Sequence, residues 1–523
     1  MKTVNRILAL FMCLVMITCV FTGCQSIQAM LDAIPDSTKE TVNPGIDKIG
    51  YTLPYIRTDS LNPYECEDEN NRNICNLLYD SLYTVNNDFK SSGVIAESNS
   101  FSENGKKLTV SIKTDVKFTD DSNVTASDVV YSFVLAKNSN YYSAYLKNIS
   151  DASARDASTV VFTLRTANPY EAGNLIFPII KKNSDKDTTH SDEYSSDLPV
   201  GSGRYTVKDE NGTKTLVVNK NRLGSYHPEY NLIGLKDITE VSSIPNLFEL
   251  NEIDFYTESF SDGAYKRYNG ESTNYETTNF AFLGINSNCS VLNESAVRRA
   301  IALLINRPDL MSVSCAGFAV AAQTPFHPSF YDLEGCTLPP IKHDKKAAIS
   351  LLEEAGYDIV SEYGIRYSPD KGKLELRLLV NKNNSFKLAM ARSIQQALAE
   401  ADIVVVLKEY SYNAYINAVE SGAWDLYIGE TKLSNSFNLN VFFAQNGNVG
   451  YGINSECETA DSYRQLMKGE IGMQDFLDTF ADELPFIPLG YRQGLTVRST
   501  RIKKDVKTTI NDYLSNIDEW TAE

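Results

Sequence analysis

The chain has 523 residues, a length that predicts two or three domains rather than one. Hydrophobic residues make up 42% of it, which is enough to build packed cores and excludes a largely disordered chain. The formal net charge is −18, and this argues against a nucleic-acid partner because no basic stripe is available to neutralise phosphates.

Residues 1–23 have the pattern of a secretory signal peptide. A short positive region precedes an apolar run over residues 7–21, which is short for a membrane span. The run ends in Gly23-Cys24, and this ending resembles a bacterial lipobox, in which Cys24 is the lipidated first residue of the mature protein. We therefore expect export, a lipid anchor at Cys24 and a polar tether over residues 24–47, with an uncleaved membrane anchor as the alternative.

Six cysteines follow the predicted signal: Cys66, Cys75, Cys289, Cys315, Cys336 and Cys457. In an oxidising compartment they allow fifteen full pairings, and the sequence does not decide among them. Cys66 with Cys75 and Cys315 with Cys336 are the local pairings that we expect first. No two of them have the CxxC spacing of a zinc site, so we predict no structural metal.

The N-terminal half alternates strands and helices. An apolar stretch predicts a strand over residues 48–56, and a one-sided apolar pattern predicts a helix over residues 70–82. Apolar and polar residues alternate over residues 108–112, which is the period of a half-buried strand. Thr125 is then placed to cap a helix, and Asp128 three residues later completes a capping box.

A strand–loop–helix unit is predicted in the middle of the chain. The apolar run over residues 280–286 predicts a buried strand. The helix after it has apolar residues at i, i+3, i+4, i+7 and i+8 from Val297, the stripe of a helix packed on a core. Asn293 and Ser295 are the candidates to cap its start, and Pro308 lies shortly beyond its expected end.

Strands and helices also alternate in the C-terminal half, which predicts a parallel sheet covered by helices. In such sheets ligands bind beyond the carboxyl ends of the strands, so the loop after Ile428 is a candidate binding loop. The predicted elements are strands over residues 374–380, 403–407 and 425–428, and helices over residues 386–398 and 412–420.

No catalytic or metal-binding motif is found in the sequence. The four histidines are far apart and lack the spacing of a metal site: His190, His227, His327 and His343. No GxSxG nucleophile elbow occurs, so Gly201-Ser202-Gly203 is interpreted as a turn. The glycines of residues 447–452 lack the strand and helix that flank a nucleotide-binding loop. We therefore predict neither an enzyme activity nor a cofactor.

The segment over residues 106–133 carries the most specific motif. It resembles a signature of the bacterial extracellular solute-binding proteins of the oligopeptide/dipeptide-binding family, with Asp121 where glycine is usual. The matching residues are Phe118, Asp120, Thr125, Ala126, Asp128, Val129 and Ser132. Further resemblances follow in the family's order over residues 199–205, 250–254, 282–307, 343–356 and 484–489. In the first of these segments, Arg204 stands where the family has proline.

This resemblance implies an α/β fold of the two-lobed, periplasmic-binding-protein type (type II) with an additional inserted domain and a ligand cleft between the lobes. We expect lobe I to consist of residues 48–64, 196–284 and 485–523. Residues 65–195 would form the inserted domain, and residues 285–484 would form lobe II.

The resemblance also implies a function. The protein would be the extracytoplasmic solute-binding component of an ABC importer, anchored to the cell membrane by its lipid and delivering its solute to a membrane permease. We expect a monomer. The alternatives are a secreted hydrolase, a surface receptor without a transport role, and a metal- or haem-binding member of the same family.

The solute is less clear from the sequence. Peptide-binding members of the family commonly carry an aspartate, after a Trp, that pairs with the peptide ammonium, and the equivalent stretch, residues 425–437, lacks it. Glu430 is the nearby acid, and Lys432 beside it would disfavour an ammonium. Peptides stay the leading class by family frequency, with a sugar or another solute as the alternative.

Candidate ligand-binding residues follow from this loop and from the entrance of lobe I: Glu430, Thr431, Ser434, Tyr55, Ser202 and Gly203. Thirty tyrosines against two tryptophans are also compatible with a cleft lined by amphipathic rings. The base composition of the genome is the simpler explanation of that number.

Overall fold

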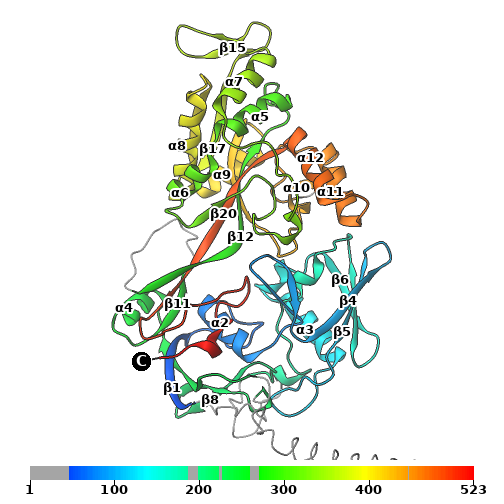
Figure 1. Cartoon of the computed structure of the whole chain (residues 1–523), viewed down its shortest axis with the longest axis vertical. Coiled ribbons are helices and arrows are strands. Elements are labelled where there is room, and N and C mark those ends of the chain that lie inside the picture. The colour runs from blue at the N-terminus through cyan, green and yellow to red at the C-terminus, as the bar shows by residue number, and fades with distance from the viewer. Residues whose placement is uncertain (1–45, 187–197, 223–225, 259–269, 446, 523) are drawn as a thin grey trace, which may run out of the picture. The chain divides into compact units, whose positions relative to one another are not determined.

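The computed structural model describes residues 46–186, 198–222, 226–258, 270–445 and 447–522 (Figure 1). The predicted signal peptide, Cys24 and nearly all of the tether lie outside these residues. No helix in the described ranges is long and apolar enough to cross a membrane.

A four-stranded sheet begins the described part of the chain. β1 pairs in parallel with β10, and β9 and β8 continue the sheet in antiparallel order. The strands are β1 (Ile46–Ile56), β8 (Tyr205–Glu210), β9 (Thr213–Val218) and β10 (Tyr230–Ile238). Helix α2 (Glu69–Leu78) packs into the core of this sheet, as does Trp520 near the C-terminus.

Helix α2 ends four residues before the predicted end at Leu82. Its N-terminus is capped by Asp68, whose side chain accepts a hydrogen bond from the Asn70 amide at 2.8 Å. At the other end, the carbonyl of Leu78 accepts a hydrogen bond from the Gly203 amide at 3.0 Å instead of continuing the helix. Leu82 is buried in the neighbouring core.

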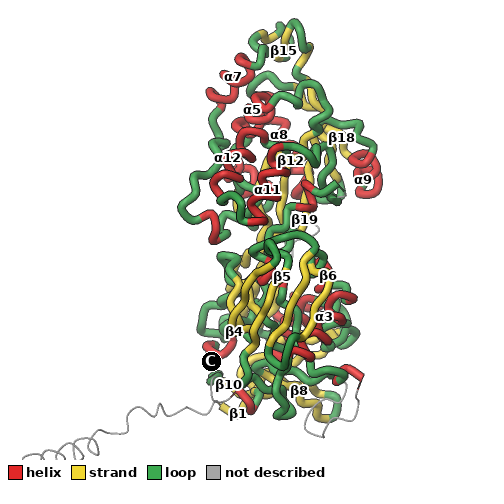
Figure 2. Tube along the Cα trace, turned by 90° about the vertical axis from the view of Figure 1, so that its right-hand side faces the viewer, coloured by secondary structure: helices red, strands yellow, loops and turns green. Residues whose placement is uncertain are grey.

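The second region is an antiparallel sheet of order β4–β5–β7–β6 with helix α3 (Figure 2). Its strands are β4 (Ala96–Ser102), β5 (Lys107–Ile112), β6 (Ile149–Ala154) and β7 (Thr159–Leu164), preceded by the hairpin of β2 (Tyr83–Val85) and β3 (Ser91–Gly93). The alternating pattern of β5 confirms the predicted half-buried strand. The predicted capping box is also confirmed, because α3 (Ala126–Asn138) begins after Thr125, whose amide donates to Asp128 Oδ2 at 2.9 Å.

The third sheet contains two long strands, β12 (Glu271–Ile285) and β20 (Phe486–Arg498). They pair antiparallel along most of their length, from Glu271 opposite Arg498 to Gly284 opposite Phe486. The sheet has the order β11–β20–β12–β19–β17–β18, with β13 paired to β20. The remaining strands are β11 (Phe255–Glu258), β13 (Ala319–Ala321), β17 (Glu375–Asn381), β18 (Val404–Tyr410) and β19 (Leu426–Lys432).

The predicted parallel unit of the C-terminal half is confirmed, since β17 pairs in parallel with both β18 and β19. The sequence did not reveal that β12 then joins β19 antiparallel, over Asn279 to Ile285. One sheet therefore runs from strands expected in lobe I to strands expected in lobe II (Figure 1). The domain limits themselves stay a prediction.

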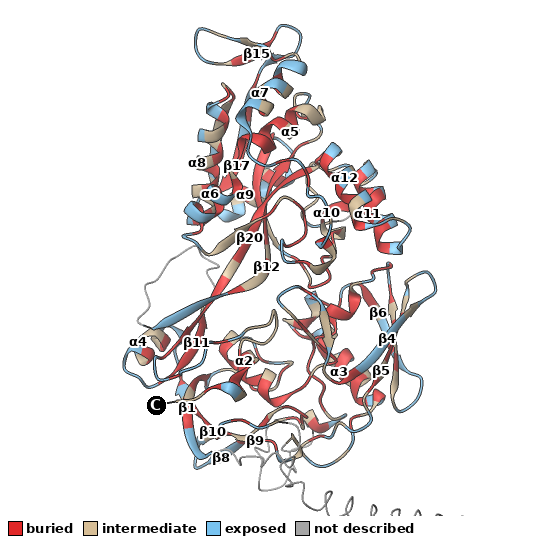
Figure 3. Ribbon diagram, viewed as in Figure 1, coloured by how far each residue is buried: buried red, intermediate tan, exposed pale blue. Residues whose placement is uncertain are grey.

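Helices surround this sheet, and their inner sides are buried while their outer sides face solvent (Figure 3). They are α4 (Ile244–Glu249), α5 (Ser295–Leu304), α6 (Arg307–Ser314), α7 (Lys345–Glu354), α8 (Ser385–Ala399), α9 (Tyr412–Glu420), α10 (Asn440–Phe443), α11 (Glu458–Lys468) and α12 (Met473–Glu483). A small sheet of β14 (Ile359–Val360), β15 (Arg366–Ser368) and β16 (Gly372–Lys373) follows α7.

Two further expectations from the sequence are wrong, and the first concerns the start of α5. Neither Asn293 nor Ser295 caps α5, because Glu294 is the N-cap residue and the Asn293 carbonyl accepts a hydrogen bond from Arg298 Nη1 at 2.8 Å.

The local cysteine pairings are the second correction. All six cysteines after the signal are free thiols. In the first local pair each thiol is a weak donor to another group: Cys66 Sγ lies 3.5 Å from Asp59 Oδ2, and Cys75 Sγ lies 3.4 Å from the Leu61 carbonyl.

Candidate ligand-binding cavity

A cavity of about 230 Å³ lies where the three sheet regions meet. Its walls come from α2, the segment around the 3-10 turn Tyr142–Ala144, the strands β12 and β20, the end of β19 and the C-terminal segment. Four tyrosines contribute to it: Tyr141, Tyr145, Tyr275 and Tyr513. We call it the tyrosine cavity.

The four rings form two pairs. The centroids of Tyr275 and Tyr513 are 4.1 Å apart with planes inclined by 34°, and those of Tyr141 and Tyr145 are 5.7 Å apart. A glycine on β20 makes room for the first pair, because a Cβ at Gly494 would lie 2.0 Å from Cζ of Tyr275. Rings of this kind offer both apolar faces and hydroxyl groups to a ligand.

Two cations face the ring of Tyr141. The guanidinium carbon of Arg72 lies 4.4 Å from its centroid, and Nζ of Lys432 lies 5.3 Å from it. Lys432 also lies 5.8 Å from the centroid of Tyr145. Each cation–ring contact of this type is worth about 0.5–2 kcal/mol.

Protonation in the cavity follows these contacts. Tyr145 and Tyr141 raise the pKa of Lys432 against the opposing effect of burial. Burial raises the pKa of Tyr141, but the charges of Lys432 and Arg72 outweigh it, so the pKa of this phenol is lowered. Lys432 and Arg72 therefore stay charged at neutral pH.

Two carboxylates line the same cavity, and their pKa values are shifted in opposite directions. Burial raises the pKa of Glu69, which accepts a hydrogen bond from the Tyr275 hydroxyl at 3.3 Å. Glu276 lies 2.9 Å from Nε2 of His327 and accepts a bond from Gln493 at 3.0 Å. Burial raises the pKa of Glu276, but the contact with His327 outweighs this effect and lowers it.

Glu430, the first of the predicted ligand residues, is partly buried and forms ion pairs with two basic residues. One carboxylate oxygen contacts Nε of Arg492, and the other lies 3.1 Å from Nζ of Lys387. Burial raises the pKa of Glu430, but Lys387 and Arg492 outweigh it and the pKa is lowered. Glu430 thus orients Arg492, which itself lines the tyrosine cavity.

Neither Glu430 nor any other predicted ligand residue is among the residues that line this cavity. Thr431 pairs with Phe280 in the sheet, and Ser434 Oγ lies 3.1 Å from Oγ of Ser436. Tyr55 is buried in the core of the first sheet. Their roles in binding stay predictions.

Ser202 and Gly203 lie against α2 instead. Ser202 Oγ donates to Asp80 Oδ2 at 3.1 Å, and a Cβ at Gly203 would lie 2.3 Å from the carbonyl carbon of Leu78. The turn that they form therefore requires a glycine for packing. Their binding role stays a prediction as well.

The predicted loop after Ile428 does contribute to the cavity, through Lys432 and Asn435. The sequence argument considered Lys432 only as a reason against an ammonium ligand. The tyrosines were missed because they come from segments far apart in the chain, and only their abundance hinted at them.

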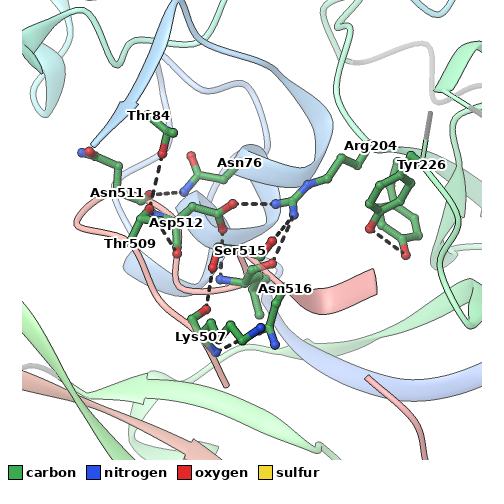
Figure 4. A network of polar contacts seen from close by, with 12 residues as sticks. Asn76, Thr84, Arg204, Tyr226, Lys507, Thr509, Asn511, Asp512, Ser515 and Asn516 are labelled. Atoms are coloured by element: carbon green, nitrogen blue, oxygen red, sulfur yellow. Dashed lines mark hydrogen bonds and ion pairs between the residues drawn. The ribbon is translucent and has the colours of Figure 1, made fainter. Parts of the chain in front are cut away.

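Arg204 holds the C-terminal segment that carries Tyr513 (Figure 4). Its Nη2 lies 2.6 Å from Oδ2 of Asp512, and its Nη1 donates to the carbonyls of Leu514 and Ser515 at 3.2 and 3.1 Å. Asn76 of α2 donates to the Asn511 carbonyl at 2.6 Å. The residue that replaces the usual proline thus positions one wall of the cavity.

A second, larger groove of about 990 Å³ lies between residues 104–106 and 165–167 on one side and α10 and α11 on the other. It has an open mouth and its charged residues include Arg464, which pairs with Asp461, and Lys468, which pairs with Glu470 at 3.6 Å. The tyrosine cavity is the better candidate, because its walls come from all three sheet regions and its rings are in direct contact with two cations. Among the described residues, no three His, Cys, Asp or Glu side chains gather as a metal site would require.

Residues 91–451 match the family described as bacterial extracellular solute-binding proteins, family 5. The chain belongs to this family. Its fold is accordingly the two-lobed α/β fold of that family, and the tyrosine cavity lies between regions predicted for different lobes.

One relative is described as a glutathione-binding protein. The glutathione-binding protein GsiB of Shigella flexneri is 26% identical over 313 residues, which are 57% of this chain and 60% of that protein. The match therefore spans less than two thirds of this relative's length.

Solved structures show the fold over a larger part of the chain. An ABC transporter substrate-binding protein from Sinorhizobium meliloti has a TM-score of 0.70 at 17% identity, covering 90% of this chain and 100% of that one. NikA from Brucella suis, in complex with Fe(III)-EDTA, has a TM-score of 0.64 at 18% identity with the same coverage.

Proposed function

We propose that this protein is the solute-binding component of an ABC importer, a monomer held outside the cell membrane by a lipid on Cys24. It captures a small solute in the tyrosine cavity and delivers it to a membrane permease. The observation that carries this proposal is the cavity itself, which is built from three regions of the fold and lined by rings and charged groups.

Hydrogen bonds beside the cavity suggest how capture works. Asn168 and Asn174 each donate to Ser436 Oγ, at 3.0 and 2.9 Å, and Asn435 donates to the Gly173 carbonyl at 3.0 Å. These bonds join the expected inserted domain to the expected lobe II. A solute that touches both sides would favour this arrangement over a more open one and so would shift the population towards it.

The solute class is the finer part of the proposal. GsiB is a glutathione-binding protein, and family frequency favours peptides. A cavity of about 230 Å³ favours a short peptide or a molecule of similar size over a long chain. A non-peptide solute is the second candidate, because residues 425–437 lack the aspartate expected for a peptide ammonium.

Binding without chemical conversion is expected. The acid side chains of the cavity are hydrogen-bonded to Tyr275, His327 and Gln493, and its lining contains neither a serine nor a cysteine. Turnover of a peptide or oligosaccharide by the purified protein would instead support the hydrolase alternative.

Native mass spectrometry of the soluble protein, residues 25–523, tests the proposal. We expect a retained small molecule or, after its removal, rebinding from a panel of peptides, glutathione and oligosaccharides, measured as a rise in melting temperature. A protein that binds no member of the panel and carries no solute would contradict the importer function and favour a surface receptor.

A further inference from the structure

The charges of the tyrosine cavity do not balance. Glu276 is bonded to His327 and Gln493, and Arg492 is paired with Glu430. This leaves Arg72 and Lys432 as cations and Glu69 as the remaining acid. Glu69 acts electrostatically on both of these cations. The three bases that line the cavity outnumber its two acids, so the cavity has an excess of positive charge.

Arg72 and Lys432 share one aromatic partner, Tyr141. In the described part of the chain, neither forms an ion pair with a carboxylate, although Nη1 of Arg72 donates to the Glu67 carbonyl. Glu430, two residues before Lys432 on β19, is already bonded to Arg492 and Lys387. The nearest acid in the sequence is therefore not available to Lys432.

Two like charges beside one ring repel each other, and two partly desolvated cations that share one acid, Glu69, are only partly compensated. An anion placed between them would remove both costs. An ammonium would add a third positive charge to the same place. An aspartate in this loop would select a positively charged group of the ligand. The two cations of this wall favour a negatively charged group instead.

We propose that the tyrosine cavity selects solutes that carry a carboxylate, which Lys432 and Arg72 hold beside Tyr141 while the rings of Tyr275 and Tyr513 contact the apolar part of the solute. This inference rests on the proposed solute-binding function and names the chemistry of that site. The carboxylate belongs either to the C-terminus of a short peptide or to a non-peptide organic acid.

Two matched pairs of probes separate these sources. The peptide pair is alanylphenylalanine and its C-terminal amide, and the non-peptide pair is N-acetylphenylalanine and its amide. Titration calorimetry on the ligand-free protein measures the dissociation constant of each. We expect the free acid to bind at least tenfold more tightly than the amide in one pair or in both. If only the peptide acid binds more tightly than its amide, the site recognises the C-terminus of a peptide. If both acids bind more tightly than their amides to the same extent, the site recognises a carboxylate of either source.

The variant Lys432→Met tests whether Lys432 binds the carboxylate. Lys468→Met in the larger groove is the matched control, because it removes the same charge outside the tyrosine cavity. We expect Lys432→Met to weaken the preferred acid at least tenfold, with little effect on its amide and on the melting temperature of the free protein. Lys468→Met should leave all four affinities within twofold of those of the unchanged protein.

The failures are distinguishable. Amides that bind as tightly as the acids, or a retained or panel solute that carries no anionic group, would overturn this inference and leave solute binding intact. An anionic solute whose affinity does not change in Lys432→Met and in Arg72→Met would also overturn it. The absence of binding to any probe, with no retained solute, would overturn the proposed function together with the inference.

Discussion

Two regions of the described chain each hold a titratable side chain that forms no ion pair, and they differ in what surrounds that side chain. Glu171, beside the contact between Asn174 and Ser436, is fully buried, and its oxygens accept bonds from Asn174 at 2.9 Å and Asn148 at 2.8 Å. Lys432, in the tyrosine cavity, faces two aromatic rings. Amide groups thus solvate the acid from within the protein, whereas the lysine keeps unfilled donor capacity.

This difference separates a structural contact from a ligand site. Asn174 donates hydrogen bonds to both Glu171 and Ser436. Glu171 therefore helps to hold Asn174 in place for the contact between two regions of the chain. A ring cannot accept the strong hydrogen bonds that an ammonium can donate. The cavity therefore favours an added anion, while the contact around Glu171 needs none.

The largest effect is expected at this contact. Asn174→Leu removes a donor from Glu171 and the bond to Ser436, and leaves a buried carboxylate with one donor fewer. We expect the free energy of unfolding to fall by about 3 kcal/mol, measured by chemical denaturation. The control Asn138→Leu, at an exposed residue of α3, should change it by less than about 0.5 kcal/mol. Equal changes in both variants would contradict a structural role of the contact.

Arg204→Met should affect both stability and the cavity. It removes the ion pair with Asp512 and the bonds to two carbonyls next to Tyr513. We expect a loss of about 2 kcal/mol in the free energy of unfolding and weaker solute binding, because one wall of the cavity is loosened. Arg204→Lys should recover part of the stability through Asp512. Unchanged affinity in Arg204→Met would show that Tyr513 does not contact the solute.

The pH dependence of stability should reveal the state of Glu171. Burial raises the pKa of this carboxyl in the folded protein, although Asn174 and Asn148 oppose the effect. The folded state then binds the proton more tightly than the unfolded chain. This contribution to stability is full below the unfolded pKa and is lost as pH rises through the folded pKa.

Denaturation at several pH values from 4 upwards, on the unchanged protein and on Glu171→Gln, isolates this contribution. The difference between the two should shrink or reverse as pH rises. Glu430 should behave oppositely, because its pKa is lowered and its stabilising effect is lost as pH falls through the folded pKa. A difference for Glu171→Gln that does not vary with pH would contradict the raised pKa.

The smallest effect is expected for Ser202→Ala. It removes one bond to Asp80, which keeps its ion pair with Arg222, so we expect a loss of about 1 kcal/mol. Solute affinity should not change, because Ser202 lies outside the tyrosine cavity. A marked loss of affinity with unchanged stability would instead show that Ser202 takes part in solute binding.

Local elements were predictable because their determinants are close together in the chain. The capping box of Thr125 and Asp128 spans four residues, and the alternating pattern of β5 spans six. Helix α9 begins and ends where its apolar periodicity predicts, at Tyr412 and Glu420. The parallel pairing of β17 with β18 and β19 follows from the strand–helix alternation.

The amino-acid sequence was enough to predict the family, the α/β architecture and the loop after β19 as a candidate binding loop. The tertiary structure decided which charges of that loop are neutralised. Glu430 meets Arg492 from 62 residues away, and Arg204 meets Asp512 from 308 residues away. Because a charge partner is set by distance in space and not by position in the chain, only the folded protein separates the paired Glu430 from Lys432, which the described residues leave without an ion pair.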